Sequence, residues 1–436
     1  MARTEECILY RNFDNGEVLD IMTSLMNNYE AGEEGFENRK EEFFHMAGSL
    51  VEMAGMYGFS GNLWHTYLTQ LLVNHENAFS TASEIRGAVE GSINHLALHD
   101  FGIFKELYDF DLAVFDSAFG TDCADFLCNY VNTGCNSKVY NQRICDRICD
   151  MSKTLAEAST VEEFMADMVQ FYKDFGVGKL GLNKAFRIEH GKDGKPVIAP
   201  ITRIAHVNLD DLVGYEIPKQ KLIENTEAFV RGRKANNCLL FGDAGTGKSS
   251  SIKGILNRYY DEGLRIIEVY KHQFQDLNDV IAQIKNRNYK FILYMDDLSF
   301  EEFEIEYKYL KAVIEGGLEK KPDNILIYAT SNRRHLVREN SGDKLEVADD
   351  KDLHSSDTVQ EKLSLVYRFG VRIYFGAPNK KEFQNIVTTL AERYGVTMPA
   401  EELLTKANAW ELSHGGLTGR TAQQFIDHVL GTSEEQ

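Results

Sequence analysis

The 436-residue sequence contains no long apolar run, no proline before residue 196 and no excess of positive charge. Its longest apolar stretches, such as residues 325–329, are much shorter than the roughly 20 residues that a membrane-spanning helix requires. No apolar signal segment follows the first six residues, so we expect a cytoplasmic protein. Hydrophobic residues make up 43% of the chain and charged residues 26%, which predicts packed domains rather than disorder.

The shortage of positive charge bears on nucleic-acid binding. The formal net charge is −20, and the first 200 residues hold 16 Lys and Arg against 31 Asp and Glu. Such a chain has no overall field that attracts phosphate backbones, so non-specific binding of nucleic acid would need a local basic patch. The acidity itself is typical of a soluble surface.

The seven cysteines do not form a recognisable metal motif. Five of them lie between residues 123 and 149, but none forms a Cys-x-x-Cys pair. Cys145 and Cys149 are four residues apart and therefore share one helix face. Because this spacing fits no zinc pattern, we expect reduced thiols and no bound metal, with a metal or redox role as the alternative.

Residues 1–180 read as a mainly helical domain. The absence of proline predicts long uninterrupted helices there. Apolar residues recur at helical spacing in residues 18–29. Thr160 followed by Glu163 predicts a capping box that begins a second amphipathic helix, and Gly176 ends it.

The pattern changes after residue 180. Two short segments of strand-like sequence, residues 186–189 and 197–199, flank a Gly-Lys-Asp-Gly-Lys turn and predict a β-hairpin within a connector of residues 181–208. From residue 209 onward strands and helices alternate, which is typical of a parallel sheet covered by helices.

Residues 242–249 match the pattern G-x-x-x-x-G-K-S/T, between a short apolar run and an amphipathic stretch. Glycines let successive backbone N–H groups face an anion, and the positive end of the following helix points to the same place. Lys248 can reach the β- and γ-phosphates of ATP, and the Ser249 hydroxyl can bind Mg²⁺. The expected ATP-binding residues of this loop are Gly242, Asp243, Ala244, Gly245, Thr246, Gly247, Lys248, Ser249 and Ser250.

A second apolar run, residues 291–295, ends in two carboxylates. Asp296 is placed to anchor Mg²⁺ together with Ser249, and Asp297 to hold and deprotonate an attacking water. Glu301 and Glu302 follow closely and could position the water instead of Asp297.

The segments LVGYE, GDAGTGKSS, MDDLSFEE, EGGLEKKPDNILIYATSNRRHL, YRFG and GRTAQQF together resemble AAA+ P-loop ATPases. They are also similar to one poorly characterised bacterial family of predicted AAA+ ATPases. The resemblance implies that Asn332 touches the γ-phosphate and that Val213 and Gly214 pack on adenine. It also implies that Arg420 reaches the phosphates from a helical lid.

The resemblance extends to a segment with an arginine finger. Arg368 in YRFG would act on ATP bound by a neighbouring subunit, which implies a homo-oligomer, and Arg338 is the competing candidate. Tyr367 stands where members of the similar family more often carry Asp. Residues 340–358 are acidic and polar and read as an insertion.

These observations predict an α/β fold of the P-loop AAA+ type, a three-layer parallel sheet with a small C-terminal helical lid, preceded by a mainly α N-terminal domain. The expected divisions are 1–180, 181–208, 209–376 and 377–436. We expect a Mg²⁺-dependent ATPase acting on an unknown protein client, with nucleic acid possible but less favoured and no membrane partner. The alternative is a nucleotide-gated switch or scaffold with little turnover.

Overall fold

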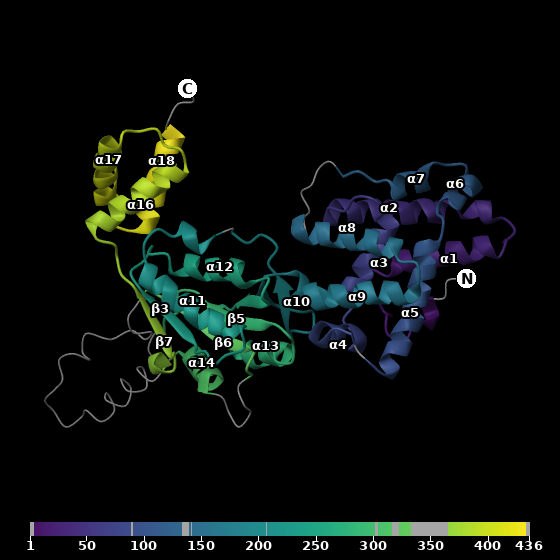
Figure 1. Ribbon diagram of the computed structural model, residues 1–436, viewed down its shortest axis with the longest axis horizontal. Coiled ribbons are helices and arrows are strands. Elements are labelled where there is room, and N and C mark those ends of the chain that lie inside the picture. Colours follow the sequence, from purple (N-terminus) through teal and green to yellow (C-terminus); the bar gives the residue numbers. More distant parts are fainter. Residues whose placement is uncertain are drawn as a thin grey trace. The chain divides into compact units, whose positions relative to one another are not determined.

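The computed structural model describes residues 4–88, 90–132, 139–140, 142–205, 207–300, 304–315, 322–332 and 365–432. Glu301, Glu302, Arg338 and the insertion at 340–358 lie outside the described residues. The chain divides into two compact units, Met1–Asn183 and Lys184–Gln436 (Figure 1). Within the described ranges, no helix is both long enough and apolar enough to span a membrane.

The first unit is helical, as the sequence predicts. Its longer helices are α1 (Glu17–Glu30), α2 (Lys40–Tyr57), α3 (Leu63–Asn74), α4 (Ala78–Arg86), α5 (Ser92–Asp109), α8 (Gln142–Glu157) and α9 (Val161–Phe175). Shorter helical segments are η1 (Thr4–Glu6), η2 (Phe36–Arg39), α6 (Ala113–Phe119), α7 (Cys123–Cys128) and α10 (Gly178–Leu182). The six cysteines of the described residues are free thiols, and no group of three or more His, Cys, Asp or Glu side chains among those residues is arranged to hold a metal.

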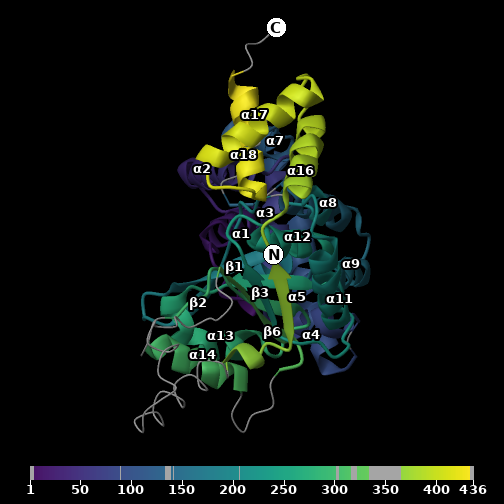
Figure 2. The ribbon, with the colours of Figure 1, turned by 90° about the vertical axis from the view of Figure 1, so that its left-hand side faces the viewer.

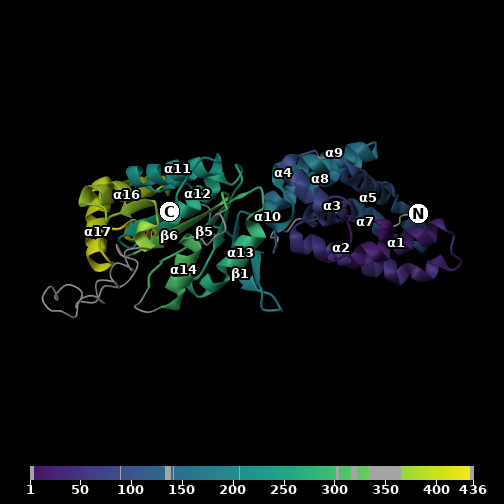
Figure 3. The same cartoon turned by 90° about the horizontal axis from the view of Figure 1, so that it is seen from below.

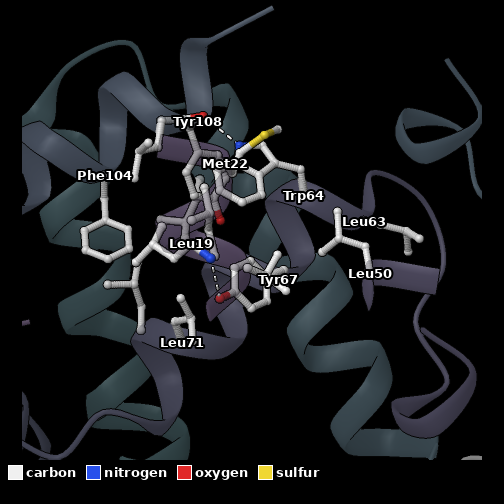
Figure 4. Packing of buried hydrophobic residues seen from close by; sticks show 14 of the residues in the cluster. Leu19, Met22, Leu50, Leu63, Trp64, Tyr67, Leu71, Phe104 and Tyr108 are labelled. Carbon is white, nitrogen blue, oxygen red and sulfur yellow. Dashed lines mark hydrogen bonds between the residues drawn. The ribbon is translucent and has the colours of Figure 1, made fainter. Parts of the chain in front are cut away.

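Helix α3 forms the centre of the first unit, and Figure 4 shows the packing around it. Nearly all of its residues are buried, so the helix packs against neighbours around its whole circumference. Buried polar atoms find partners on neighbouring helices: Trp64 Nε1 donates to the Leu107 carbonyl at 2.9 Å, and the Tyr67 hydroxyl accepts from the Leu19 N–H at 3.0 Å. These contacts make the interior a packed core in which both of these polar groups have hydrogen-bond partners.

The start of α9 differs in detail from the predicted capping box. Thr160 Oγ1 accepts from the Glu163 N–H at 3.2 Å, as expected. The Glu163 carboxylate, however, accepts from the N–H of Ser159 at 2.8 Å, one residue earlier than the box requires. The helix ends at Gly176, whose φ of 80° suits glycine.

The second unit is built on one seven-stranded sheet with the order β2-β1-β4-β5-β6-β3-β7. Its strands are β1 (Ala185–His190), β2 (Pro196–Pro200), β3 (Cys238–Gly242), β4 (Leu264–Glu268), β5 (Lys290–Met295), β6 (Ile325–Ser331) and β7 (Val371–Phe375). All neighbours are parallel except β1 and β2. The hairpin expected in a connector therefore extends the sheet, because β1 pairs with β4.

Helices cover both faces of this sheet, as Figure 3 shows. Helices α11 (Glu216–Val230) and α12 (Lys248–Tyr259) lie on one face, and α13 (Leu277–Ile284) and α14 (Ile305–Glu315) on the other. The short segments η3 (Leu209–Asp211) and η4 (Lys271–Asp276) connect these layers. Parallel strands with helices on both faces form the three-layer architecture that the alternating pattern predicted.

Three further helices form a lid with its own apolar core. These are α16 (Lys380–Arg393), α17 (Ala400–Ser413) and α18 (Gly419–Thr432), which lie together in Figure 2. Their buried contacts include Phe383, Val387, Ala407 and Ile426. Val213, from the segment before α11, also packs against this cluster. The lid therefore contacts the segment that the sequence predicts to pack on adenine.

Candidate functional site

The carboxyl ends of β3, β5 and β6 meet at one edge of the sheet. Leu240 pairs with Thr330 and Met295 pairs with Ala329, so these strands end nearly in register. The glycine-rich loop, the two aspartates and Asn332 each follow one of these strands. The topology therefore brings together residues that are far apart in the sequence, at the edge where open α/β sheets bind ligands.

Two glycines of the loop adopt backbone conformations that residues with a side chain rarely adopt. Gly242 has φ of 135°, and a Cβ there would lie 2.1 Å from the Phe375 carbonyl oxygen. Gly247 has φ of 90° and is the N-cap of α12. These positions turn the chain sharply between β3 and α12, so that the helix N-terminus points into the loop. A helix N-terminus enclosed by backbone amides is a site for an anion.

Lys248 is buried and directed at the loop. Its Nζ donates to the carbonyls of Gly242 at 3.0 Å and Asp243 at 2.6 Å. Burial lowers the pKa of Lys248, against the opposing effect of Asp243, Asp297 and Asp296. A cation enclosed in this way is well placed to pair with phosphate.

Asp296 accepts several hydrogen bonds at one oxygen. Its Oδ1 accepts from Ser249 Oγ at 2.7 Å, Tyr294 OH at 2.7 Å and Thr330 Oγ1 at 2.5 Å. Burial tends to raise the pKa of Asp296, but these hydrogen bonds outweigh it and hold the pKa below its usual value. An ionised carboxylate beside a serine hydroxyl is an oxygen donor set that suits Mg²⁺, so the residues present fit this ion.

Asp297 and Asn332 are in direct contact. Asn332 Nδ2 donates to Asp297 Oδ1 at 2.7 Å, which joins the expected water-holding residue to the expected γ-phosphate contact. Asp297 has φ of 48°, a conformation that is uncommon outside glycine. Its N–H donates to Thr330 Oγ1 at 2.9 Å. Residues held in such conformations cluster at functional sites.

These groups surround a cavity of about 660 Å³, a size typical of small-molecule sites. Of the residues predicted from the sequence, those that line it are Val213, Ala244, Gly245, Thr246, Gly247, Lys248, Ser249, Ser250, Asp296, Asp297, Asn332 and Arg420. The predicted residues Gly214, Gly242 and Asp243 are not part of its lining. Leu212, Ile386 and Leu390 add an apolar wall that the sequence motifs did not indicate.

The lid contacts the loop at two points. The Arg420 N–H donates to the Gly245 carbonyl at 3.2 Å. In the segment before α16, the Ala377 N–H donates to the Asp243 carboxylate at 2.7 Å. Asp243 therefore joins the loop to the segment that leads into the lid.

Arg368 does not join this site. It precedes β7, whose residues Val371 to Phe375 pair with Cys238 to Gly242 of β3. The length of β7, about 13 Å at roughly 3.3 Å per residue, therefore separates Arg368 from the loop edge. Its guanidinium forms an ion pair with Glu315 at the end of α14.

Sequence reasoning missed Thr330 and Tyr294, both of which hydrogen-bond Asp296. Tyr294 stands two residues before Asp296, so the period of a strand places both side chains on one face. No local signal marks Thr330, since its partners lie on another strand.

The sheet order, the glycine loop at the end of β3 and the helical lid define a P-loop fold of the AAA+ class. Residues 182–433 match the family described as "Protein of unknown function (DUF815)". This match covers more than half of the chain, and the protein belongs to that family.

Among solved structures, a mutant RuvB from Thermotoga maritima is 18% identical over 52% of this chain and 65% of its own, with a TM-score of 0.37. The FIGL-1 AAA domain in complex with ADP is 17% identical over 52% of this chain and 74% of its own, with a TM-score of 0.35. The Orc1 protein of Aeropyrum pernix in complex with DNA is 16% identical over 52% and 62%, with a TM-score of 0.38. Less than two thirds of the RuvB chain is thus covered. The comparison with curated proteins gives no match.

Proposed function

We propose that this protein is a Mg²⁺-dependent AAA+ ATPase, which hydrolyses ATP in the cavity between the sheet edge and the lid. One observation supports the proposal most: the Ser249 hydroxyl lies 2.7 Å from Asp296 Oδ1, directly beside the buried Lys248. Oxygen donors for a hard cation next to an anion-binding loop are the combination that a magnesium nucleotide requires.

Each residue has a distinct role in this proposal. The loop amides and Lys248 bind the phosphates, while Leu212, Val213 and the lid residues Ile386 and Leu390 enclose the base. Ser249 and Asp296 would hold Mg²⁺, which supplies charge neutralisation of the phosphates when bound. Asp297 orients a water and takes its proton, and Asn332 fixes the Asp297 carboxylate.

Arg420 would offset the charge that develops on the γ-phosphate, since it lines the cavity from the lid. We further propose that the nucleotide drives conformational work on a protein or nucleic-acid partner. The bonds from the loop to the segment before α16 and to the start of α18 support this part, because phosphate binding and lid position are then linked.

Phosphate release by the purified, concentrated protein tests the hydrolysis. We expect Mg²⁺-dependent release from the wild type, and at least a roughly hundredfold slower release from Asp297→Asn with ATP binding retained. Release by Asp297→Asn at the wild-type rate would remove Asp297 from its role and would favour Glu301 or Glu302.

Arg368 lies at the opposite end of the strands from the phosphate loop of its own subunit. This position supports a homo-oligomer in which Arg368 acts on the nucleotide of a neighbouring subunit. Mixing two inactive variants, Lys248→Ala and Arg368→Ala, tests this arrangement. Mixed assemblies contain sites with an intact loop beside an intact finger, so partial activity is expected to return. If mixing restores nothing although the variants co-assemble, Arg368 does not act between subunits.

A second candidate function is a nucleotide-gated switch with negligible turnover. The observation that favours it is that Asn332 already occupies one oxygen of Asp297, whose side chain is shorter than the Glu frequent at this position in AAA+ proteins. A switch would bind ATP and ADP with Mg²⁺ but release no phosphate in the oligomeric state. The same phosphate assay therefore separates the two candidates.

The partner is tested separately. The Asp297→Asn variant should retain a client in the ATP state, and the recovered partner identifies its class. A salt-sensitive mobility shift with single-stranded or duplex DNA would favour a nucleic-acid partner.

A further inference from the structure

One buried hydroxyl at the candidate site contacts both aspartates and has no role in the function proposed above. Thr330 lies in β6, its side chain is almost completely buried, and it precedes Asn332 by two residues. Its Oγ1 donates to Asp296 Oδ1 at 2.5 Å and accepts from the Asp297 N–H at 2.9 Å. A single hydroxyl thus joins the Asp296 carboxylate, the expected Mg²⁺ ligand, to the backbone of Asp297, the residue expected to hold the water.

The chemistry of a hydroxyl accounts for both contacts. The hydroxyl donates a hydrogen bond to the Asp296 carboxylate through its one hydrogen. One of its oxygen lone pairs accepts a hydrogen bond from the Asp297 N–H. The Thr330 carbonyl adds a third contact, because it accepts from the Leu298 N–H at 2.7 Å. The turn after β5 is therefore fixed to β6 at three points, around the residue with the unusual φ of 48°.

Tyr294 completes the environment of Asp296. Its buried hydroxyl donates to the same Oδ1 oxygen at 2.7 Å. Two hydroxyls other than that of Ser249 therefore hold one oxygen of Asp296, and Asp296 Oδ2 has no hydrogen-bond partner among the described residues. This arrangement fixes the rotation of the carboxylate and leaves Oδ2 free to contribute to the Mg²⁺ site that Ser249 and Asp296 would form.

We propose that Thr330 is a positioning residue that couples the metal-side carboxylate of Asp296 to the water-side residue Asp297, with Tyr294 as its second support. This inference rests on the proposed function, because it assigns Thr330 a part in Mg²⁺ nucleotide binding and turnover. A purely structural role for the same contacts would affect stability alone.

The experiment compares Thr330→Val, which removes the hydroxyl at nearly constant volume, with Thr330→Ser, which keeps it. The first readout is binding of ADP by calorimetry with and without Mg²⁺, which does not depend on turnover. We expect the affinity gain from Mg²⁺ to fall about tenfold to a hundredfold in Thr330→Val, the size expected for a hydrogen bond to a charged group. In Thr330→Ser the gain should stay within about threefold of wild type.

The second readout is phosphate release as a function of Mg²⁺ concentration. Thr330→Val should lower kcat and raise the Mg²⁺ concentration needed for half-maximal rate, with smaller change in the KM for ATP. Both changes should be rescued in Thr330→Ser, which a mere packing defect at this position would not require.

Helix α11 offers a matched control. Thr226 is also fully buried, and its hydroxyl bonds the Leu222 carbonyl at 2.8 Å and Tyr328 OH at 2.9 Å, away from the cavity lining. Thr226→Val should lower stability without altering the Mg²⁺ dependence. If Thr330→Val does not fold, Tyr294→Phe replaces it, with Tyr328→Phe as the control on the same face of the sheet.

The outcomes separate the inference from the proposed function. A wild type with Mg²⁺-dependent ADP binding and a Thr330→Val or Tyr294→Phe variant with unchanged Mg²⁺ dependence would overturn the inference and leave the function standing. A wild type that binds no nucleotide in the presence of Mg²⁺ would overturn both. Loss of Mg²⁺ dependence in the site variants but not in their controls is the supporting result.

Discussion

Two aspartates, one in each unit, receive several hydrogen bonds each but serve different purposes. Asp100 in the first unit is fully buried, and its carboxylate accepts the backbone N–H groups of Ile8, Leu9 and Tyr10. Asp296 in the second unit is exposed at the cavity, and most of its donors are side-chain hydroxyls. Asp100 therefore fixes the N-terminal segment to the core of the first unit, whereas Asp296 is held in one orientation at the edge of a cavity.

The difference extends to the surroundings of the two residues. In the first unit, buried polar side chains pair with one another rather than with a ligand, as the hydroxyls of Tyr10 and Tyr172 do at 2.9 Å. The second unit brings Lys248, Asp296 and Asp297 to one edge of the sheet, where a ligand can contact all three. Substitutions in the first unit should therefore change stability, and those at the sheet edge should change nucleotide binding.

The largest effect is expected from Lys248→Ala. The variant loses the cation that would pair with the phosphates, so nucleotide affinity should fall several hundredfold, about 3–4 kcal/mol. The fold should persist, because burial already disfavours the charged form of Lys248. Calorimetry with ATP and Mg²⁺ measures the affinity, and Lys253→Ala, an exposed lysine on the same helix, is the control. If Lys248→Ala bound ATP with the same heat and affinity as the wild type, Lys248 would not be part of the nucleotide site.

The next effect concerns stability alone. Asp100→Ala leaves three backbone N–H groups near the N-terminus without their acceptor, which should lower the free energy of unfolding by about 3 kcal/mol. Urea unfolding followed by circular dichroism measures it, and nucleotide affinity should not change. Asp109→Asn, which breaks only an exposed ion pair with Lys105, should cost less than about 1 kcal/mol. Weaker nucleotide binding by Asp100→Ala would break the contrast between the units.

The extent to which sequence predicted these features follows from how local their contacts are. The glycine loop could be predicted because the residues that determine its backbone conformation are eight consecutive residues, 242–249. The bond from Thr330 to Asp296 was not, since it joins two strands across 34 positions. The hairpin of β1 and β2 was predicted as a hairpin, but its place in the sheet depends on the distant β4.

The contacts of single side chains also depend on residues that are distant in the sequence. The position of Arg368 came from a resemblance, whereas its ion pair with Glu315 depends on the meeting of α14 and the start of β7. The capping box predicts that the Glu163 carboxylate accepts from the Thr160 N–H, but it accepts from the Ser159 N–H instead. Sequence spacing alone does not distinguish these two donors. The assigned roles of the site residues stay predictions until nucleotide binding is measured.

An intermediate effect should arise at the link between loop and lid. Asp243→Ala removes the acceptor of the Ala377 N–H, so the lid segment loses its bond to the phosphate loop. Because Asp243 does not line the cavity, we expect only about a fivefold to tenfold weaker affinity, the size of one hydrogen bond. Asp243→Asn keeps an oxygen acceptor and should recover most of the affinity in calorimetry. Equal losses in both variants would indicate that the charge of Asp243 matters rather than its bond to Ala377.

The smallest effects come from two helix caps and give the finest test of the contrast. Thr160 caps α9 in the first unit, and Asn379 caps α16 in the lid with bonds from the N–H groups of Lys381 and Glu382. Replacing either residue by Ala should cost about 1 kcal/mol of stability, because each helix loses a cap. Only Asn379→Ala should also weaken nucleotide binding, by about twofold to threefold, since α16 carries Ile386 and Leu390 of the cavity wall. A matched loss of affinity in Thr160→Ala, measured by the same calorimetric titration, would mean that the first unit influences the nucleotide site after all.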